Sequence, residues 1–188
     1  EKLLATNCNL ESLTEFDSLK RLQICDLSCN QLTDFPLIDS IVLLNLSCNK
    51  FSTIPPISSE LKLLDLSLNL INNENQDRIE ITAPNLVDIN LSYNFISKIP
   101  KIKFSPNLTY FKISGNPLTD KTLDLSKSIF LRLIDVSMTD LHNVKQPSLV
   151  NELMTSNHHL NCNLPLKPHH LYQKVPSEKE WRFCKSGY

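Results

Sequence analysis

The chain has 188 residues, 41% of them hydrophobic, and a formal net charge of −1 at pH 7. That length suffices for one domain with a large core. The near-neutral balance gives no electrostatic argument for nucleic-acid or membrane binding, and no apolar run approaches the roughly 20 residues of a membrane helix. The sequence has only two glycines, Gly115 and Gly187, so it contains no glycine-rich phosphate loop.

A repeated pattern organises most of the chain. Residues 22–32, LQICDLSCNQL, have the form LxxLxLxxNxL with a cysteine in one leucine position. We number the positions of this pattern as slots 1 to 11. Slot 9, the asparagine slot, recurs every 19 to 25 residues and is filled by Cys8, Asn30, Asn49, Asn69, Asn94, Asn116 and Thr139. Slots 4, 6 and 11 are apolar in every repeat, and self-similarity at this period is the signature of a solenoid.

The pattern resembles the leucine-rich repeat superfamily over roughly residues 1–145. Five segments fit the family pattern: LQICDLSCNQL, IVLLNLSCNKF, LKLLDLSLNLI, LVDINLSYNFI and LTYFKISGNPL. The resemblance implies an α/β-type repeat solenoid of about seven repeats, right-handed and curved, with a parallel β-sheet on the concave side. The alternation of apolar slots 4 and 6 with polar slots agrees, because it is typical of a half-buried strand. The slot-9 amide can satisfy backbone groups of its own and the adjacent coil, so Cys8 and Thr139 predict weaker coil-to-coil bonding.

The segments that return along the convex side are short. TDFP at 33–36, STIP at 52–55 and SKIP at 97–100 each place an apolar residue before a proline. Proline cannot continue a helix, so we expect these returns to be extended or 3₁₀ rather than α-helical. The longest repeat interval contains a polar bulge, NNENQDRIEITAP at 72–84. We interpret it as a solvated loop insertion, with a partner-contact loop as the alternative.

Beyond Leu141 the repeat pattern fails, and we assign residues 146–188 to a C-terminal cap with short helices. The segment PSLVNELMTSN aligns only loosely, with Glu152 in a core slot. We expect one helix over 148–155 and another beginning at the capping-box pair Ser177 and Glu180, which would carry Trp181 and Phe183 under the cap. Glu1 lies inside the first repeat, so we interpret it as an artificial or a processing boundary, and the absence of a visible signal peptide means little.

In a solenoid of this kind, slots 3, 5, 7 and 8 face the concave side. Slot 7 is a row of serines, and slot 5 is mostly Asp or Asn, which is common filling in the family. Slots 3 and 8 are more informative because they place apolar and aromatic side chains where solvent would be, as at protein interfaces. The predicted partner-binding residues are Ile24, Asp26, Leu43, Asn45, Leu63, Asp65, Leu68, Asp88, Asn90, Tyr93, Tyr110, Lys112, Leu133, Asp135 and Met138. The aspartates among them favour a partner with some basic character.

Six cysteines do not form the spacing of a small disulfide scaffold. Cys29 and Cys48 should lie on adjacent coils about 4.8 Å apart, and in-register parallel neighbours rarely reach disulfide geometry. Cys162 and Cys184 could form a disulfide in the cap, or remain free thiols. A zinc site of these two with the tail histidines is disfavoured, because the spacing matches no familiar finger. We therefore predict no metal and no cofactor.

The sequence predicts a non-enzymatic module that binds a protein or peptide on its concave face, for scaffolding, targeting or sensing. All histidines lie in the tail, so the serine and aspartate rows lack the base that Ser/His/Asp chemistry needs. Two alternatives stay open: a substrate-selecting region of a larger kinase, phosphatase or ligase, and an extracellular receptor or adhesion ectodomain. The unpaired repeat cysteines and the absence of a four-cysteine cap favour an intracellular (cytoplasmic) location over an extracellular one.

Overall fold

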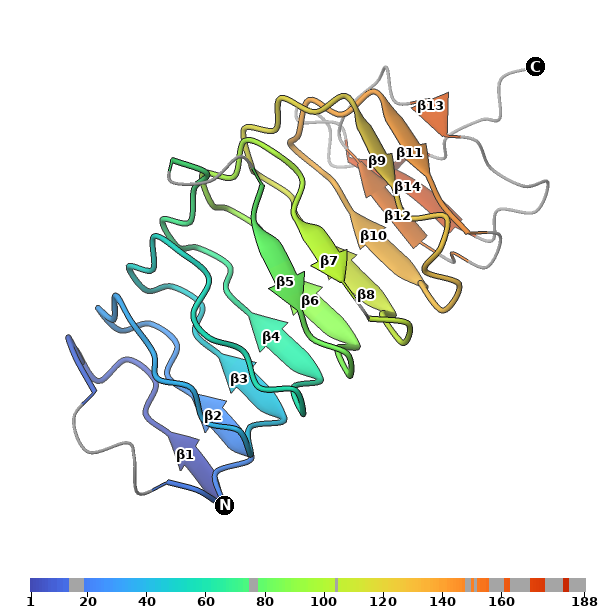
Figure 1. Ribbon diagram of the computed structural model, residues 1–188. Helices are drawn as coiled ribbons and strands as arrows, with labels where there is room; N and C mark the ends of the chain where they lie inside the picture. Colours follow the sequence, from blue (N-terminus) through green and yellow to red (C-terminus); the bar gives the residue numbers. More distant parts are fainter. Residues whose placement is uncertain are drawn as a thin grey trace.

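The computed structural model describes residues 1–13, 19–74, 78–103, 105–147, 150, 152–155, 161–162, 170–174 and 181–182, with only the backbone described from residue 161 on. The chain winds as a parallel β-solenoid in which each repeat forms one coil (Figure 1). The described residues contain strands and turns but no helix. Nothing in that part of the chain is therefore a helix that could span a membrane.

A ten-stranded sheet lines the concave side. Its order is β1-β2-β3-β4-β6-β8-β10-β12-β14-β15. All neighbours pair in parallel except β14 and β15, which pair antiparallel at the C-terminal end. The strands are β1 (Lys2–Leu4), β2 (Ile24–Asp26), β3 (Leu43–Asn45), β4 (Leu63–Asp65), β6 (Asp88–Asn90), β8 (Tyr110–Lys112), β10 (Leu133–Asp135), β12 (Glu152–Thr155), β14 (His170–Lys174) and β15 (Trp181–Arg182).

Two smaller parallel sheets lie on the convex side. One pairs β5 (Glu80–Thr82) with β7 (Lys101–Lys103), and the other has the order β13-β11-β9. Its strands are β9 (Thr122–Asp124), β11 (Asn143–Lys145) and β13 (Asn161–Cys162). The prediction of mostly non-helical returns is confirmed, and Figure 1 shows these strands stacked along one side of the solenoid.

The core lies between the concave strands and the convex returns. In β2, β3, β4, β6 and β10 the central, slot-4 residue is buried and its two neighbours are half-buried, so slot 4 points inward and slots 3 and 5 point outward. Slots 6 and 11 add a second and a third buried column. Coil after coil stacks the same apolar positions, and each coil is covered by its neighbours. In the first coil the equivalent Leu3, Ala5 and Leu10 are only partly buried.

The slot-9 asparagines bond each coil to the one before it. Asn69 is typical: its Nδ2 donates to the carbonyl oxygens of Leu46 and Leu66 at 3.0 and 3.1 Å, and its Oδ1 accepts from Phe51 N at 3.0 Å. Asn30, Asn49, Asn94 and Asn116 bond in the same way. Thr139, in contrast, donates to Val136 O of its own coil at 2.7 Å, and no side-chain bond from it to another coil occurs among the described residues. The weaker bonding expected at Thr139 is therefore present.

The helix predicted over 148–155 is wrong for Glu152–Thr155, which form strand β12. The error is one of register: Leu153, not Glu152, pairs with the buried Ile134, while Glu152 pairs with the outward Leu133. Strand β12 pairs with the backbone edge of β10 that β8 leaves open. The 2.9 Å bond from Val136 N to Met154 O continues this pairing. The second predicted helix is also wrong at Trp181–Arg182, which are strand β15. Its start at Ser177 and Glu180, and Phe183, lie outside the described residues, so the cap as a whole stays a prediction.

The polar bulge at 72–84 is not simply a solvated loop. Its second half contains β5, with Ile79, Ile81 and Ala83 buried. The register of β5 on β7 places Ile81 beside Ile102. The bulge therefore contributes a strand to the convex side, because every second residue of RIEITA is apolar and can face the core.

We expect Asn69→Ala to lower the free energy of unfolding by about 3 kcal/mol, because it leaves buried backbone groups of two coils without hydrogen-bond partners. Urea unfolding followed by circular dichroism at pH 7 measures this. Asn107 is exposed and serves as the control, since Asn107→Ala should change the unfolding free energy by less than about 0.5 kcal/mol. Equal effects at the two sites would contradict the role assigned to the asparagine column.

Candidate functional site: the concave face

The sheet register gathers the predicted residues on one face. In slot 3, each residue pairs with the next along the sheet: Ile24, Leu43, Leu63, Asp88, Tyr110 and Leu133. The same register aligns slot 5: Asp26, Asn45, Asp65, Asn90, Lys112 and Asp135. All of these side chains are half-buried except Tyr110, which is 37% exposed. The face thus carries an apolar row next to a polar row.

The slot-5 side chains form paired hydrogen-bond units. Asp26 Oδ1 accepts from the backbone N–H and the hydroxyl of Ser28 at 3.0 and 2.7 Å, and its Oδ2 accepts from Asn45 Nδ2 at 3.1 Å. Asn45 Oδ1 in turn accepts from Ser47. Both carboxylate oxygens of Asp26 are therefore occupied within the protein.

The same unit recurs two coils later. Asp65 Oδ1 accepts from the N–H and hydroxyl of Ser67 at 2.9 and 2.6 Å, and its Oδ2 accepts from Asn90 Nδ2 at 3.1 Å. Burial alone would raise the pKa of Asp26, but the hydrogen bonds from Ser28, Asn45 and Thr6 outweigh it and hold that pKa below its usual range. These aspartates and asparagines bond to side chains of the protein itself, so they order the face rather than offer free groups to a partner. Asn45 and Asn90 also lie in glycosylation sequons, and their amides are already engaged.

Asp88 differs from these aspartates because it lies in the apolar row. It is half-buried between Leu63 and Tyr110, and no hydrogen bond to its carboxylate occurs in the described part of the chain. Burial raises the pKa of the Asp88 carboxyl above its ordinary value, and the opposing effect of Lys112 is offset in part by Asp65. Asp88 is therefore a carboxylate that is not hydrogen-bonded, at the centre of the face.

The slot-8 residues form an edge row where the chain leaves each strand. Leu68, Tyr93 and Met138 are 55%, 48% and 63% exposed, and all three have φ near +55°. The Tyr93 hydroxyl lies 3.8 Å from Met138 Sδ. The Tyr93 ring lies over Gly115, where an added Cβ would be 2.6 Å from Tyr93 Cδ1. The glycine thus lets the ring lie flat along the edge towards Met138.

Two exposed apolar residues of this edge were missed by the sequence reasoning. Leu70 and Phe95 fill slot 10 and are 46% and 58% exposed. Slot 10 is polar in most other coils, as at Gln31 and Lys50, so a large apolar residue there was the available signal. With Leu68, Tyr93 and Met138 they make up the apolar edge of the middle and later coils.

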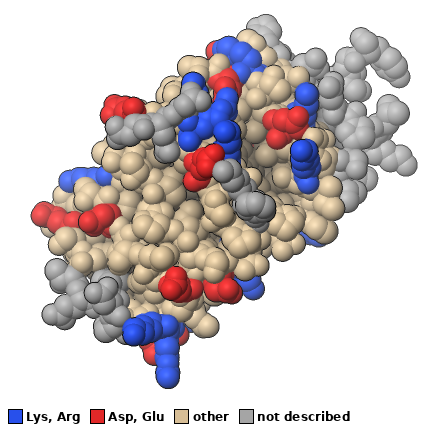
Figure 2. Space-filling model, in the orientation of Figure 1, with Lys and Arg blue, Asp and Glu red and all other residues tan. Residues whose placement is uncertain are grey.

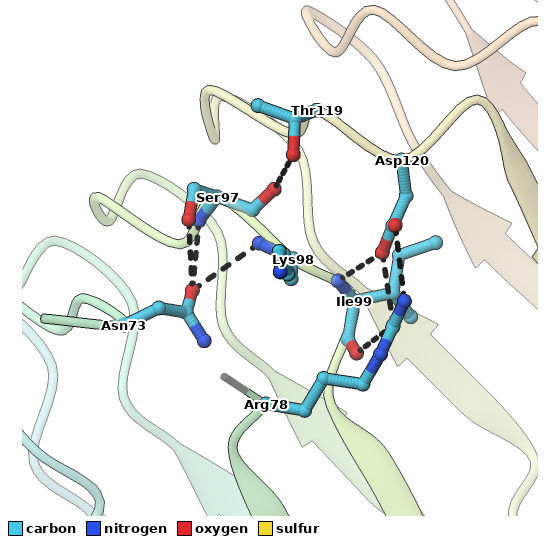
Figure 3. Close-up of polar contacts among 7 residues, drawn as sticks. All are labelled: Asn73, Arg78, Ser97, Lys98, Ile99, Thr119 and Asp120. Carbon is cyan, nitrogen blue, oxygen red and sulfur yellow. Dashed lines mark hydrogen bonds and ion pairs between the residues drawn. The ribbon is translucent and has the colours of Figure 1, made fainter. Parts of the chain in front are cut away.

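A polar cluster on the convex side braces the middle coils (Figure 3). The Arg78 guanidinium makes two bonds to the Asp120 carboxylate, at 2.9 and 3.1 Å, and a third to Ile99 O at 3.0 Å. Asp120 Oδ2 also accepts from Ile99 N at 2.8 Å. Asn73 Oδ1 accepts from the backbone N–H groups of Ser97 and Lys98 at 2.9 and 3.2 Å. The bulge is therefore fastened to the next two coils.

Charges of opposite sign alternate on the convex side. Figure 2 shows basic side chains next to acidic ones on the face drawn. Besides Arg78–Asp120, the ion pairs there include Lys101–Glu80 and Lys145–Asp124, at 3.8 and 3.7 Å. A hollow of about 620 Å³, lined by Ile102, Phe111 and Leu123 among others, lies on this side and shares no residue with the concave set.

The four cysteines with described side chains are free thiols: Cys8, Cys25, Cys29 and Cys48. Burial raises the pKa of Cys25 to about 12, so this thiol is inert at neutral pH. The Cys162–Cys184 disulfide stays a prediction, because Cys184 and the side chain of Cys162 lie outside the described residues.

Three solved structures share the fold. YopM from Yersinia enterocolitica WA-314 aligns with a TM-score of 0.65 at 19% identity, over 92% of this chain and 40% of its own. The internalin InlF from Listeria monocytogenes aligns with a TM-score of 0.56 at 14% identity, over 92% of this chain and 62% of its own. The leucine-rich repeat domain of APL1B gives 0.58 at 20% identity, over 89% of this chain and 62% of its own.

The chain therefore spans only part of the length of each of these proteins, and at such identities the likeness shows the fold. No protein-family model matches the sequence. No curated protein matches it significantly.

Asp120→Ala should lower the free energy of unfolding by about 1–3 kcal/mol at pH 7, because it leaves Arg78 and Ile99 N without their shared acceptor. The hydrogen bonds of Ile99 and Arg78 lower the pKa of Asp120 despite its burial. Asp120 therefore contributes fully to the free energy of unfolding above the pKa of about 4 that it has in the unfolded chain. This contribution is lost as the pH falls through the lower pKa of the folded protein. Urea unfolding of the wild type and of Asp120→Ala between pH 7 and pH 3 measures this. The difference between their unfolding free energies should become smaller as the pH falls.

Lys145→Ala, which removes the exposed pair with Asp124, is the control and should cost less than about 1 kcal/mol. A loss in Asp120→Ala that is no larger than in Lys145→Ala would show that the brace contributes nothing beyond a surface ion pair.

Proposed function

We propose that this chain, which has the leucine-rich-repeat fold, is a non-enzymatic module that binds a protein or peptide on its concave face and apolar edge. Leucine-rich-repeat solenoids present such a face as an extended sheet whose outward positions vary freely without disturbing the core. The role would be scaffolding, targeting or sensing. The only histidine whose side chain is described, His142, lies beside Asp140 and not beside the serine row, which supports a binding rather than a catalytic role.

The apolar residues on the face and edge support a protein partner. Leu63, Tyr110 and Leu133 lie on the sheet, and Tyr93 and Phe95 lie on the adjoining edge. Aromatic side chains with partly exposed rings are typical anchors of protein interfaces. An open, gently curved face suits a macromolecular surface better than a small ligand, which needs a concave pocket around it.

Asp88 is the observation that carries the proposal. Burial between Leu63 and Tyr110 disfavours the charged form of the Asp88 carboxyl and raises its pKa, although Lys112 acts in the opposite direction. A lysine or arginine of a partner would offset that cost while its aliphatic stem packs on Leu63 and Tyr110. The face therefore fits a partner segment in which a basic residue is flanked by apolar ones.

The triple variant Leu63→Ala/Tyr93→Ala/Tyr110→Ala should weaken partner binding by on the order of a hundredfold or more, because aromatic anchors each contribute about 1–3 kcal/mol. Partners are recovered with the tagged chain from a lysate of the source cells and identified by quantitative mass spectrometry. The affinity of each purified partner is then measured by calorimetry.

Leu37→Ala is the matched control: Leu37 is 54% exposed but lies on a return segment. It should leave the affinity unchanged. If the triple variant, with an unchanged circular dichroism spectrum, binds as well as the wild type, the concave site is ruled out.

Asp88→Asn should weaken binding of that partner and at the same time leave the fold equally or more stable. The folded state disfavours the ionised Asp88, so removing the charge relieves a cost that is present above its raised pKa. Only the ionised form pairs with a cation, so wild-type affinity should rise as the pH increases through the pKa of Asp88. In Asp88→Asn this pH dependence should disappear, as calorimetry between pH 4 and pH 8 would show. If the affinity of Asp88→Asn depended on pH as that of the wild type does, Asp88 would not be part of the binding site.

A further inference from the structure

Two cysteines occupy the same slot of neighbouring coils. Cys29 and Cys48 both fill slot 8, both have a φ of 56°, and both side chains are exposed free thiols. The Cys29 N–H donates to the carbonyl oxygen of Ser47 at 2.9 Å. That carbonyl belongs to the peptide group that joins Ser47 to Cys48. The two side chains therefore leave the backbone side by side, one coil spacing apart.

The two thiols are near enough to influence each other. The interaction with the Cys48 thiol is the main effect that raises the pKa of Cys29, and the charge of Asp26 adds to it. The position of the pair at the end of β2 and β3 leaves it open to solvent.

The pair stands apart from the other cysteines. Cys25 is buried, and Cys8 lies in slot 9, where its Sγ donates to Thr6 O at 3.4 Å. Leu68 fills slot 8 of the next coil, so the stack of sulfurs ends at two. Within the described residues, no three or more His, Cys, Asp and Glu side chains gather as metal ligands. A metal ion here would have two protein ligands.

We propose that Cys29 and Cys48 bind one thiophilic monovalent metal ion, with Cu(I) as the representative, between their two sulfurs. Two metal–sulfur bonds of about 2.3 Å in line span about 4.6 Å, close to the about 4.8 Å between neighbouring coils. A disulfide is the competing outcome, because the spacing of about 4.8 Å also lies within the roughly 4.4–6.8 Å that separates the Cα atoms of disulfide-bonded cysteines. Soft thiolate ligands select Cu(I) over hard cations. Binding converts two thiols and one Cu(I) into a bis-thiolate complex and releases two protons.

Anaerobic titration of the reduced protein with Cu(I), in competition with a chromogenic Cu(I) chelator, tests the proposal. We expect one ion per chain in this site. Cys29→Ser and Cys48→Ser should each weaken binding by on the order of a hundredfold or more, because the second sulfur of a chelate acts at high effective concentration. Cys8→Ser and the double variant Cys162→Ser/Cys184→Ser should keep the wild-type affinity.

Alkylation of the thiols followed by mass spectrometry gives a second readout. Bound Cu(I) should protect Cys29 and Cys48 together and leave Cys8 reactive. Wild-type Cu(I) affinity in either Cys29→Ser or Cys48→Ser would overturn the site. The same conclusion would follow if the reduced protein took up no Cu(I) and formed a Cys29–Cys48 disulfide in air. Neither readout depends on the partner of the concave face.

Discussion

The side-chain amide of slot 9 is the interaction on which the solenoid depends. A coil of about 20 residues is too short to bury its own leucines or to satisfy its own backbone groups. The neighbouring coils cover the leucines and supply the missing hydrogen-bond partners. Asn94 shows the arrangement: its Nδ2 donates to the carbonyl oxygens of Leu66 and Leu91, one in the coil before and one in its own. Because the amide both donates and accepts across the same turn, no serine, threonine or cysteine replaces it fully. The inward side of every coil is fixed by this requirement, and only the outward slots can vary.

Variation of those outward slots is concentrated in the middle coils. Along β2, β3, β4 and β6, slot 5 alternates Asp and Asn, and the side chains bond in pairs, Asp26 with Asn45 and Asp65 with Asn90. At β8 the alternation ends with Lys112, and at β6 the apolar slot 3 is interrupted by Asp88. The exposed Phe95 belongs to the same coils. On the convex side of these coils, the bond from Arg78 to Asp120 holds the bulge in place. The exceptions on the outward face therefore lie on coils that are braced from the opposite side.

The sequence could predict what repeats and could not predict what occurs once. Slots 4 and 6 are apolar in every repeat and slot 9 is asparagine in five of them, so the register of β2, β3, β4, β6, β8 and β10 followed directly from counting. Residues 150–155 do not match the pattern visibly, because Thr155 replaces an apolar slot-6 residue and Val150 replaces leucine. The helical expectation failed there because strand β12 is stabilised by the edge of β10, a tertiary effect that a local pattern does not carry. The bond between Arg78 and Asp120 crosses 42 residues, and nothing local links them.

The backbone of slot 8 adopts left-handed φ values along the whole edge row. Left-handed φ values cost little for glycine or asparagine but more for large side chains, roughly 1 kcal/mol or more each. Cys29, Cys48, Leu68, Tyr93 and Met138 all adopt it, held there by bonds such as that from Tyr93 N to Ser114 O at 2.7 Å. Glycine occurs in this row only at Gly115, beneath the Tyr93 ring. The fold alone would be more stable with glycine or asparagine throughout the row. Large apolar and sulfur-containing side chains at these positions therefore cost stability, and this cost is the reason to propose a role for the edge row beyond the fold itself.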